Sequence, residues 1–186
     1  MQSNPTTAPV LIELDAACRA THFDRAAAWF RNVQLVQASY RQLLEDTAAE
    51  IEEPHIKAYL LTMLDRARGH EQQAERLFSL IDREPSTTIR TTLGEIVGKS
   101  RELWADIIAL GGGAKSPWQD LQQLYISNAN SMSAFAVAEM LGLALGLPDV
   151  LDVTAAVVNE KRIDEVLLQE CALEMCSISI LYQDRF

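Results

Sequence analysis

Apolar residues recur at alternating steps of three and four along most of this sequence, and prolines stand where the pattern stops. The pattern is clearest between residues 54 and 82, where it occupies Ile56, Leu60, Met63, Ala67, His70, Ala74, Leu77 and Ile81. Such spacing places the side chains on one face of an α-helix. No segment shows the strict apolar–polar alternation of a half-buried strand. The sequence therefore predicts an all-α protein.

We call such a series of positions on one helix face a seam. A second seam precedes the first one, in the segment Phe23–Glu53. Its members are Ala26, Phe30, Val33, Gln37, Tyr40, Leu44, Thr47 and Ile51. Pro54 separates the two segments, because the residue before a proline avoids the α region and proline itself suits the first turn of a helix. The turn between the helices is very short, so we expect them to form an antiparallel pair.

The same spacing predicts four further helices. Their expected ranges are Pro9–Ala20, Thr87–Leu110, Pro117–Leu145 and Asp149–Leu181. The four long helices form two antiparallel hairpins, and the helix at 87–110 lies in the crossover that joins them. We expect one domain at 23–186, preceded by an N-terminal tail and short helix at 1–22. This arrangement is a four-helix bundle with one crossover connection.

Composition narrows the class of protein further. Hydrophobic residues make up 48% of the chain, which excludes disorder, and 26 acidic against 16 basic residues give a formal charge of −10. This charge disfavours nucleic acids and anionic membranes as partners. The most apolar stretch, 133–158, contains Glu139, Asp149 and Asp152, so we expect no membrane span. Three cysteines without paired spacing and an N-terminus without a signal-peptide pattern predict a cytoplasmic protein.

Polar residues interrupt the apolar seams in the middle of the predicted helices. They are Gln37, His70, Gln73, Asn128, Ser131 and Glu160. Gln37 and His70 should face each other about 25 Å from the turn at Pro54, at the helical rise per residue, and Glu160 should approach from the other hairpin. Buried polar groups need hydrogen-bond partners or a ligand. The seam is therefore a hydrogen-bonded network, a metal site or a small-molecule site.

The stretch Tyr40–Phe78, which reads YRQLLEDTAAEIEEPHIKAYLLTMLDRARGHEQQAERLF, resembles the ferritin-like superfamily. It looks closest to rubrerythrin-like domains and to small bacterial ferritin-like proteins of unknown function. Relatives share a long helix, an Asp-Pro or Glu-Pro turn, and a helix ending in a Glu-x-x-His-Ala-Glu-Arg-Leu type of run. Leu124–Leu168 repeats this layout more faintly. The resemblance implies a ferritin-like four-helix bundle over about Phe23–Leu168.

Di-iron members of the superfamily take one Glu from each of two helices and a Glu-x-x-His pair from each of the other two. In this sequence the two single Glu positions correspond to Gln37 or Ala38 and to Asn130 or Ser131. The two Glu-x-x-His pairs correspond to His70 and Gln73 and to Glu160 and Ile163. Only Glu160 is of the expected type, although His70 is able to act as a ligand. Two iron ions need several carboxylates for charge balance. We therefore expect a degenerate di-iron site that holds no metal pair.

Three functional hypotheses follow. The first is a non-catalytic bundle without a cofactor, which acts by self-association as a homodimer or by binding a partner protein. The second is a divergent iron or manganese protein, an oxidoreductase or a storage protein, with ligands from His70, Glu160 and nearby Glu71 or Asp164. The third is a small-molecule binder that uses the polar centre. Gly142 and Gly146 permit close helix packing, either around a buried central helix or at a homodimer face.

Overall fold

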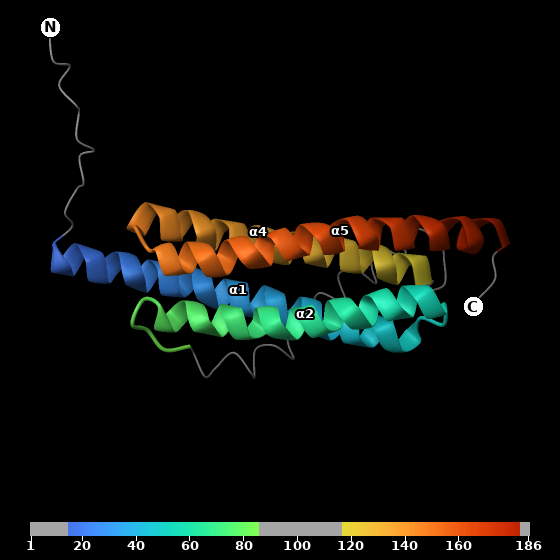
Figure 1. Ribbon diagram of the computed structural model, residues 1–186, viewed down its shortest axis with the longest axis horizontal. Coiled ribbons are helices and arrows are strands. Elements are labelled where there is room, and N and C mark those ends of the chain that lie inside the picture. The colour runs from blue at the N-terminus through green and yellow to red at the C-terminus, as the bar shows by residue number, and fades with distance from the viewer. Residues whose placement is uncertain (1–14, 86–116, 183–186) are drawn as a thin grey trace, which may run out of the picture.

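Four long α-helices make up the computed structural model, which describes residues 15–85 and 117–182 (Figure 1). They are α1 (Ala16–Glu50), α2 (Pro54–Ser79), α4 (Pro117–Leu145) and α5 (Pro148–Tyr182). The described residues contain no strand, so the all-α prediction is confirmed for them. The helix expected at 87–110, and residues 9–14 of the first expected helix, lie outside these ranges.

The four helices form a bundle in which each one packs against two others. α1 packs against α2 and α4, and α5 packs against α4 and α2, so α1 and α5 stand diagonally opposite. α1 and α5 run in one direction along the bundle, and α2 and α4 run in the other (Figure 1). α2 therefore ends at the opposite end of the bundle from the start of α4. Two antiparallel hairpins with this arrangement form a four-helix bundle with one long connection.

Helix α1 starts earlier than the sequence predicts. Asp15 caps it, with its side chain accepting a hydrogen bond of 2.7 Å from the backbone N–H of Cys18. The helix then continues without a break through Thr21, whose hydroxyl donates to the carbonyl of Ala17 one turn back. The expected boundary between a short first helix and a long helix at Phe23 is therefore wrong.

The hairpin of α1 and α2 is closed at Pro54, as the sequence predicts. α1 ends when Ile51 adopts an extended conformation, and Pro54 opens α2. At its other end α2 stops at Ser79 instead of Asp82. Asp82 lies in the left-handed region at φ 53°, which aspartate tolerates better than most residues, and this turn ends the helix.

The hairpin of α4 and α5 turns at Gly146 and depends on a second glycine one turn earlier. Gly146 has a φ of 66°, a conformation that favours glycine at a helix C-terminus. Gly142 is buried, and a Cβ atom there would lie 2.8 Å from Cγ1 of Val150. The close approach at Gly142 is thus between α4 and α5 of one chain, which at this glycine favours the first alternative, close packing within the bundle.

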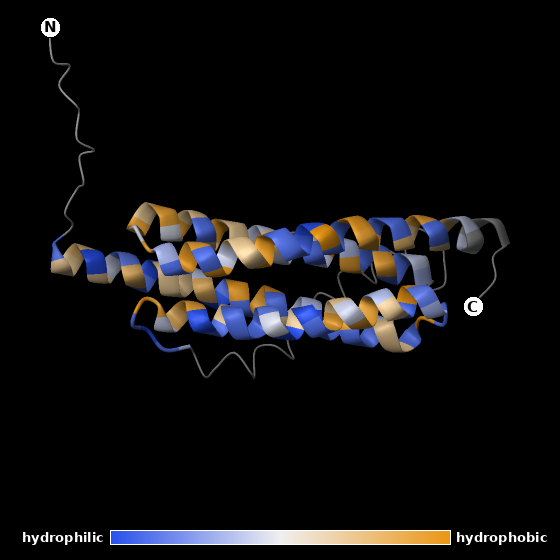
Figure 2. Cartoon of the chain, viewed as in Figure 1, coloured by the Kyte–Doolittle hydropathy of each residue, from blue (hydrophilic) through white to orange (hydrophobic). Residues whose placement is uncertain are grey.

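Two apolar clusters fill the bundle, one toward each end. The first gathers around Phe30, Phe78 and Phe135, with Phe30 and Phe78 in edge-to-face contact at 5.9 Å between ring centroids. The second gathers around Leu60 and Leu168. Hydrophilic turns occupy the middle of α5, between apolar turns on either side (Figure 2). The polar residues of the bundle therefore lie in a layer between two apolar cores.

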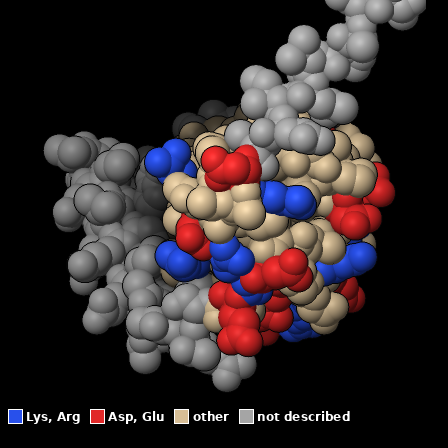
Figure 3. Space-filling view, turned by 90° about the vertical axis from the view of Figure 1, so that its left-hand side faces the viewer, with Lys and Arg blue, Asp and Glu red and all other residues tan. Residues whose placement is uncertain are grey.

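The surface carries charges of both signs. At the end that holds the α4–α5 turn, basic and acidic side chains are interspersed with uncharged ones (Figure 3). Among the described residues, no helix is both long enough and apolar enough to cross a membrane.

Candidate functional site: a polar layer across the bundle

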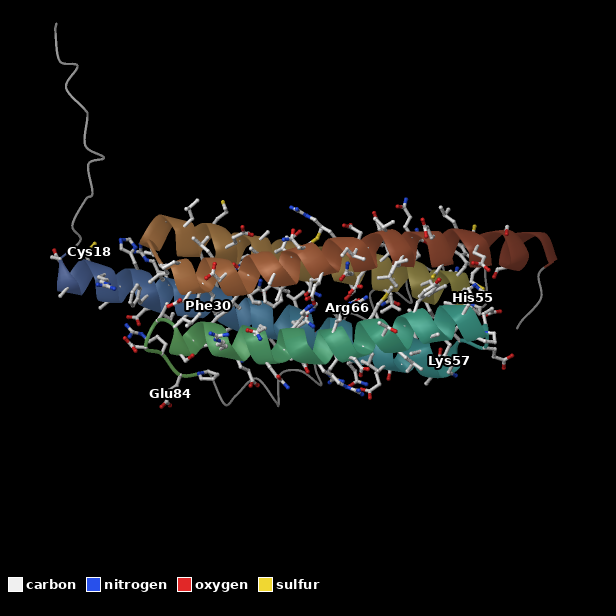
Figure 4. The ribbon with its side chains drawn as sticks, in the orientation of Figure 1. Cys18, Phe30, His55, Lys57, Arg66 and Glu84 are labelled. Atoms are coloured by element: carbon white, nitrogen blue, oxygen red, sulfur yellow. The ribbon has the colours of Figure 1, made fainter. Side chains whose placement is uncertain are left out.

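All four helices contribute polar side chains to the layer between the two apolar clusters. α1 supplies Gln37, α2 supplies Arg66 and His70, α4 supplies Asn128 and Ser131, and α5 supplies Lys161 and Asp164. Arg66 lies halfway along the bundle, on the side of α2 that faces α5 (Figure 4). Except for Arg66, which is half-buried, these residues are buried. We refer to these seven residues as the polar layer.

Gln37 joins three helices through its amide group. Its Nε2 donates to the backbone carbonyl of Ala67 on α2 at 2.9 Å, and its Oε1 accepts from the hydroxyl of Ser131 on α4 at 2.7 Å. Both the donor and the acceptor end of a fully buried amide are thereby used. Gln37 contacts α2 at Ala67, one turn before His70, and both side chains are buried. No hydrogen bond joins Gln37 to His70 among the described residues, and the polar partner of His70 is Glu160.

Asn128 joins α4 to α5. Its Nδ2 donates to the backbone carbonyl of Lys161 at 2.9 Å, while its Oδ1 has no hydrogen-bond partner among the described residues. The side chain is fully buried. Asn128 therefore fixes the relative height of α4 and α5 within their hairpin, because an amide that loses its partner inside the bundle costs free energy.

Lys161 is the most unusual member of the polar layer, because its whole side chain is buried. Its Nζ lies 4.2 Å from the centroid of the Tyr40 ring and has no hydrogen-bond partner among the described residues. Burial disfavours the charged form and lowers the pKa of Lys161 to about 7, although the carboxylate of Asp164 opposes this change. The bundle centre thus contains an amine that is close to half-protonated at neutral pH.

Asp164 shares the interior with Lys161 and pairs with Arg66 across the α2–α5 contact. The Asp164 side chain is 1% exposed, whereas that of Arg66 is 30% exposed and reaches toward solvent. Burial raises the pKa of Asp164, and the neighbouring Arg66 and Lys161 oppose that rise. This pair compensates part of the charge of the polar layer within the bundle.

His70 meets Glu160 at the edge of the polar layer, with 2.8 Å between Nε2 and Oε2. Burial, and then the positive charge of Lys161, lower the pKa of His70 to about 4 despite the nearby carboxylate. The imidazole is therefore neutral at pH 7, and the contact is a hydrogen bond to a carboxylate instead of an ion pair. Since a carboxylate only accepts, Nε2 carries the hydrogen and Nδ1 keeps a lone pair. That buried Nδ1 has no partner among the described residues.

The structure places the six residues of the predicted polar seam in different environments. Gln37, His70, Asn128 and Ser131 are buried, as the spacing predicts. Gln73 is half-buried on the surface of α2, and the Glu160 side chain is 50% exposed, so the expectation that these two are buried is wrong. Their positions toward solvent leave both free to take part in surface contacts.

The other positions considered for metal ligands are dispersed. Glu71 points to α1, where it pairs with Arg41 at 2.9 Å, and Ile163 is 62% exposed. Asn130 is exposed. In the described ranges no three His, Cys, Asp or Glu side chains lie close enough together to hold a metal ion. His70 and Glu160 form the one cross-hairpin pair among the proposed ligands.

Sequence reasoning missed Lys161, which the structure places where Glu160 was expected. After Val157, the next residue that faces the interior is either three positions on, at Glu160, or four positions on, at Lys161. The buried Leu168 decides between them. Steps of four and then three back from Leu168 reach Asp164 and then Lys161, so Lys161 is the residue that faces the interior. The apolar residues that follow in α5 were the signal that decides the phase of this helix.

Known proteins offer no further guide to this site. A scan against protein-family models finds no match for this chain, and a search of curated proteins finds no relative.

Proposed function

We propose that this chain is a ferritin-like bundle that has no di-metal centre and acts by associating with a second copy of itself. The ferritin-like assignment is supported by the direction of the helices, since α1 and α5 run one way and α2 and α4 the other, with one long connection between the hairpins. It is also supported by a layer of polar side chains at the middle of the bundle, where the di-iron members of the superfamily carry their ligands.

The chemistry of the polar layer argues against the alternative of an iron or manganese oxidoreductase or storage protein. Hard metal ions are held by several carboxylates. Here α1 and α4 contribute the uncharged Gln37 and Ser131, and their polar atoms already bind each other. α5 contributes Lys161, which brings positive charge to the place where cations would sit. Asp164, the carboxylate of the polar layer, is already paired with Arg66.

The observation that carries the proposal of self-association is the exposure of large apolar side chains on α4 and α5. Among the described residues, six of the eight large hydrophobic side chains with the greatest exposure belong to these two helices. They are Val137, Met140, Leu143, Ile163, Val166 and Leu173, with exposed fractions of 40% to 64%. We call these six the apolar face. Exposed apolar side chains at helical spacing mark contact sites, and in a symmetric dimer the same residues supply both halves of the interface.

Light scattering and sedimentation on the full chain at micromolar concentration test this proposal. We expect twice the mass of one chain, and a return to the mass of one chain in the variants Met140→Glu and Leu143→Glu. Leu61→Glu is the matched control, because Leu61 is 49% exposed but lies on α2. A wild-type protein with the mass of one chain, or a dimer that Leu61→Glu disrupts equally well, would contradict the proposal.

A further inference from the structure

A groove of about 410 Å³ opens between α2 and α5, beside the polar layer and away from the six residues of the apolar face. Its volume lies within the range of small-molecule sites in proteins. The groove exists because Gly69 on α2 and Ala156 on α5 project no long side chain into the space between the helices. His70 and Glu160 close one end of it, and Arg76 and Asp149 lie toward the other.

Most of the charged side chains that line the groove have no hydrogen-bond or ion-pair partner among the described residues. Asp149, Asp152 and Arg76 line it, and the side chains of these three make no hydrogen bond or ion pair within the described part of the chain. Glu160 accepts a hydrogen bond from the neutral His70 and keeps its negative charge. Three carboxylates against one guanidinium leave two negative charges without compensation, which favours a cationic ligand.

The acidic and apolar side chains that α5 contributes to the groove follow one another along the helix axis. Asp152, Ala156 and Glu160 follow each other at intervals of four on α5, so the two carboxylates stand about 12 Å apart at the helical rise. Between them Val153 and Val157, both buried, form the floor of the groove. The site therefore offers an acidic group at each end and an apolar middle.

The end at Glu160 also suits a hydrogen-bond donor. His70 lines the groove with a side chain that is only 4% exposed, and its Nε2 donates to Glu160 at 2.8 Å, which holds that carboxylate in place. An ammonium group donates three hydrogens and accepts none. The carboxylate of Glu160, which only accepts hydrogen bonds, is therefore the acceptor for such a group at this end.

We propose that this groove binds a linear aliphatic polyamine. One terminal ammonium lies at Asp149 and Asp152, the other lies at Glu160, and the methylene chain covers Val153 and Val157. Arg76 compensates one of the two carboxylates at its end, so each end of the groove offers one net negative charge to one ammonium. An anion would meet three carboxylates, and a zwitterionic amino acid would leave the charge of the groove uncompensated.

Titration calorimetry with spermidine tests this inference, because its terminal nitrogens are separated by about the distance between the two acidic ends, and its internal ammonium is able to face solvent at the open side of the groove. We expect saturable binding of one spermidine per chain. Putrescine, which is too short, and octylamine, which has one charge, should each bind several-fold more weakly. Binding should also weaken as salt is added, since exposed charges are screened.

Variants of the groove separate specific binding from general attraction to an acidic protein. Asp152→Asn and Glu160→Gln should each weaken spermidine binding about fivefold, the upper range for half-exposed ion pairs. Ala156→Leu should block the groove without changing its charge. Glu75→Gln, an exposed position on α2 outside the groove, is the control that should leave binding unchanged. Should Glu160→Gln prove unstable, Asp152→Asn still decides the question, since Asp152 has no hydrogen-bond or ion-pair partner among the described residues.

Three results would overturn the inference. They are the lack of saturable spermidine binding at moderate salt, equal weakening by Glu75→Gln and by Asp152→Asn, and octylamine binding as tightly as spermidine. None of these results bears on self-association, which involves other residues and is measured by mass.

Discussion

Replacing Lys161 by methionine should stabilise this protein at pH 6 and remove most of the rise in its stability between pH 7 and 9. The reason lies in the burial of the Lys161 amine, which lowers its pKa from 10.5 to about 7 in the folded protein. Between these two values the unfolded chain binds a proton at Lys161 that the folded protein has lost. The free energy of unfolding therefore increases with pH across this window, and the full cost of the buried charge is present below pH 7.

The size of the effect follows from the same two values. Each pKa unit corresponds to 1.36 kcal/mol, so the buried ammonium costs about 5 kcal/mol when the folded protein is fully protonated at this site. Methionine has a similar length and carries no charge, and replacing buried ions by apolar residues commonly stabilises proteins by 1 to 4 kcal/mol. We expect Lys161→Met to raise the free energy of unfolding at pH 6 by about 2 to 4 kcal/mol. The attraction between Lys161 and the Tyr40 ring is lost in the variant and limits the gain.

Urea unfolding followed by far-ultraviolet circular dichroism at pH 6, 7.5 and 9 measures this effect. The difference between wild type and variant at each pH isolates Lys161 from other groups that titrate. Lys57→Met is the matched control, because Lys57 is half-buried at the surface, where its Nζ donates to the carbonyl of Ile51 at 3.3 Å. If Lys161→Met is less stable than wild type at pH 6, or if both have the same pH dependence, the reasoning is refuted.

Three further predictions concern packing and hydrogen bonding. Gly142→Ala should lower stability by about 1 to 3 kcal/mol, because its Cβ would lie 2.8 Å from Val150, and thermal unfolding should show partial recovery when Val150→Ala is added. Gln37→Leu should cost about 1 to 3 kcal/mol in urea unfolding by leaving the Ser131 hydroxyl unpaired, and an unchanged midpoint would contradict its role. Because the pKa of His70 is lowered to about 4, stability should fall as the pH decreases from 6.5 toward 4, and His70→Gln should reduce this slope.

The inward-facing positions of the first hairpin could be predicted from the sequence. All eight seam positions from Ala26 to Ile51 and all eight from Ile56 to Ile81 are buried. They could be found because apolar residues occupy nearly every position of the pattern and Pro54 fixes the turn between the helices. Where both conditions hold, the phase of a helix follows from spacing alone.

The phase of α5 could not be read in the same way. Around Val157 the apolar residue Ile163 faces solvent while Lys161 faces the interior, which reverses the usual preference of both residue types. A long aliphatic stem lets lysine pack inside a bundle, and Asp164 and the Tyr40 ring lie close to its amine. Part of this compensation comes from Tyr40 on α1, so no local pattern in α5 reveals it.

The start of α1 was missed for a different reason. The segment around Thr21 and His22 lies near the end of the bundle, where few apolar positions mark the seam, and so the pattern seemed to begin again at Phe23. In the structure the hydroxyl of Thr21 binds within its own helix and the helix continues unbroken. Local hydrogen bonding, which spacing does not report, decides such boundaries.

The central claim is that a buried lysine and a hydrogen-bonded polar layer occupy the place of a di-metal centre. Metal analysis tests it most directly, by incubating the purified chain with ferrous iron or manganese, removing unbound metal, and measuring the metal retained per chain by mass spectrometry. We predict no stoichiometric retention of either metal by the wild-type protein. Retention of two ions per chain, lost on replacing His70 or Glu160, would contradict the account.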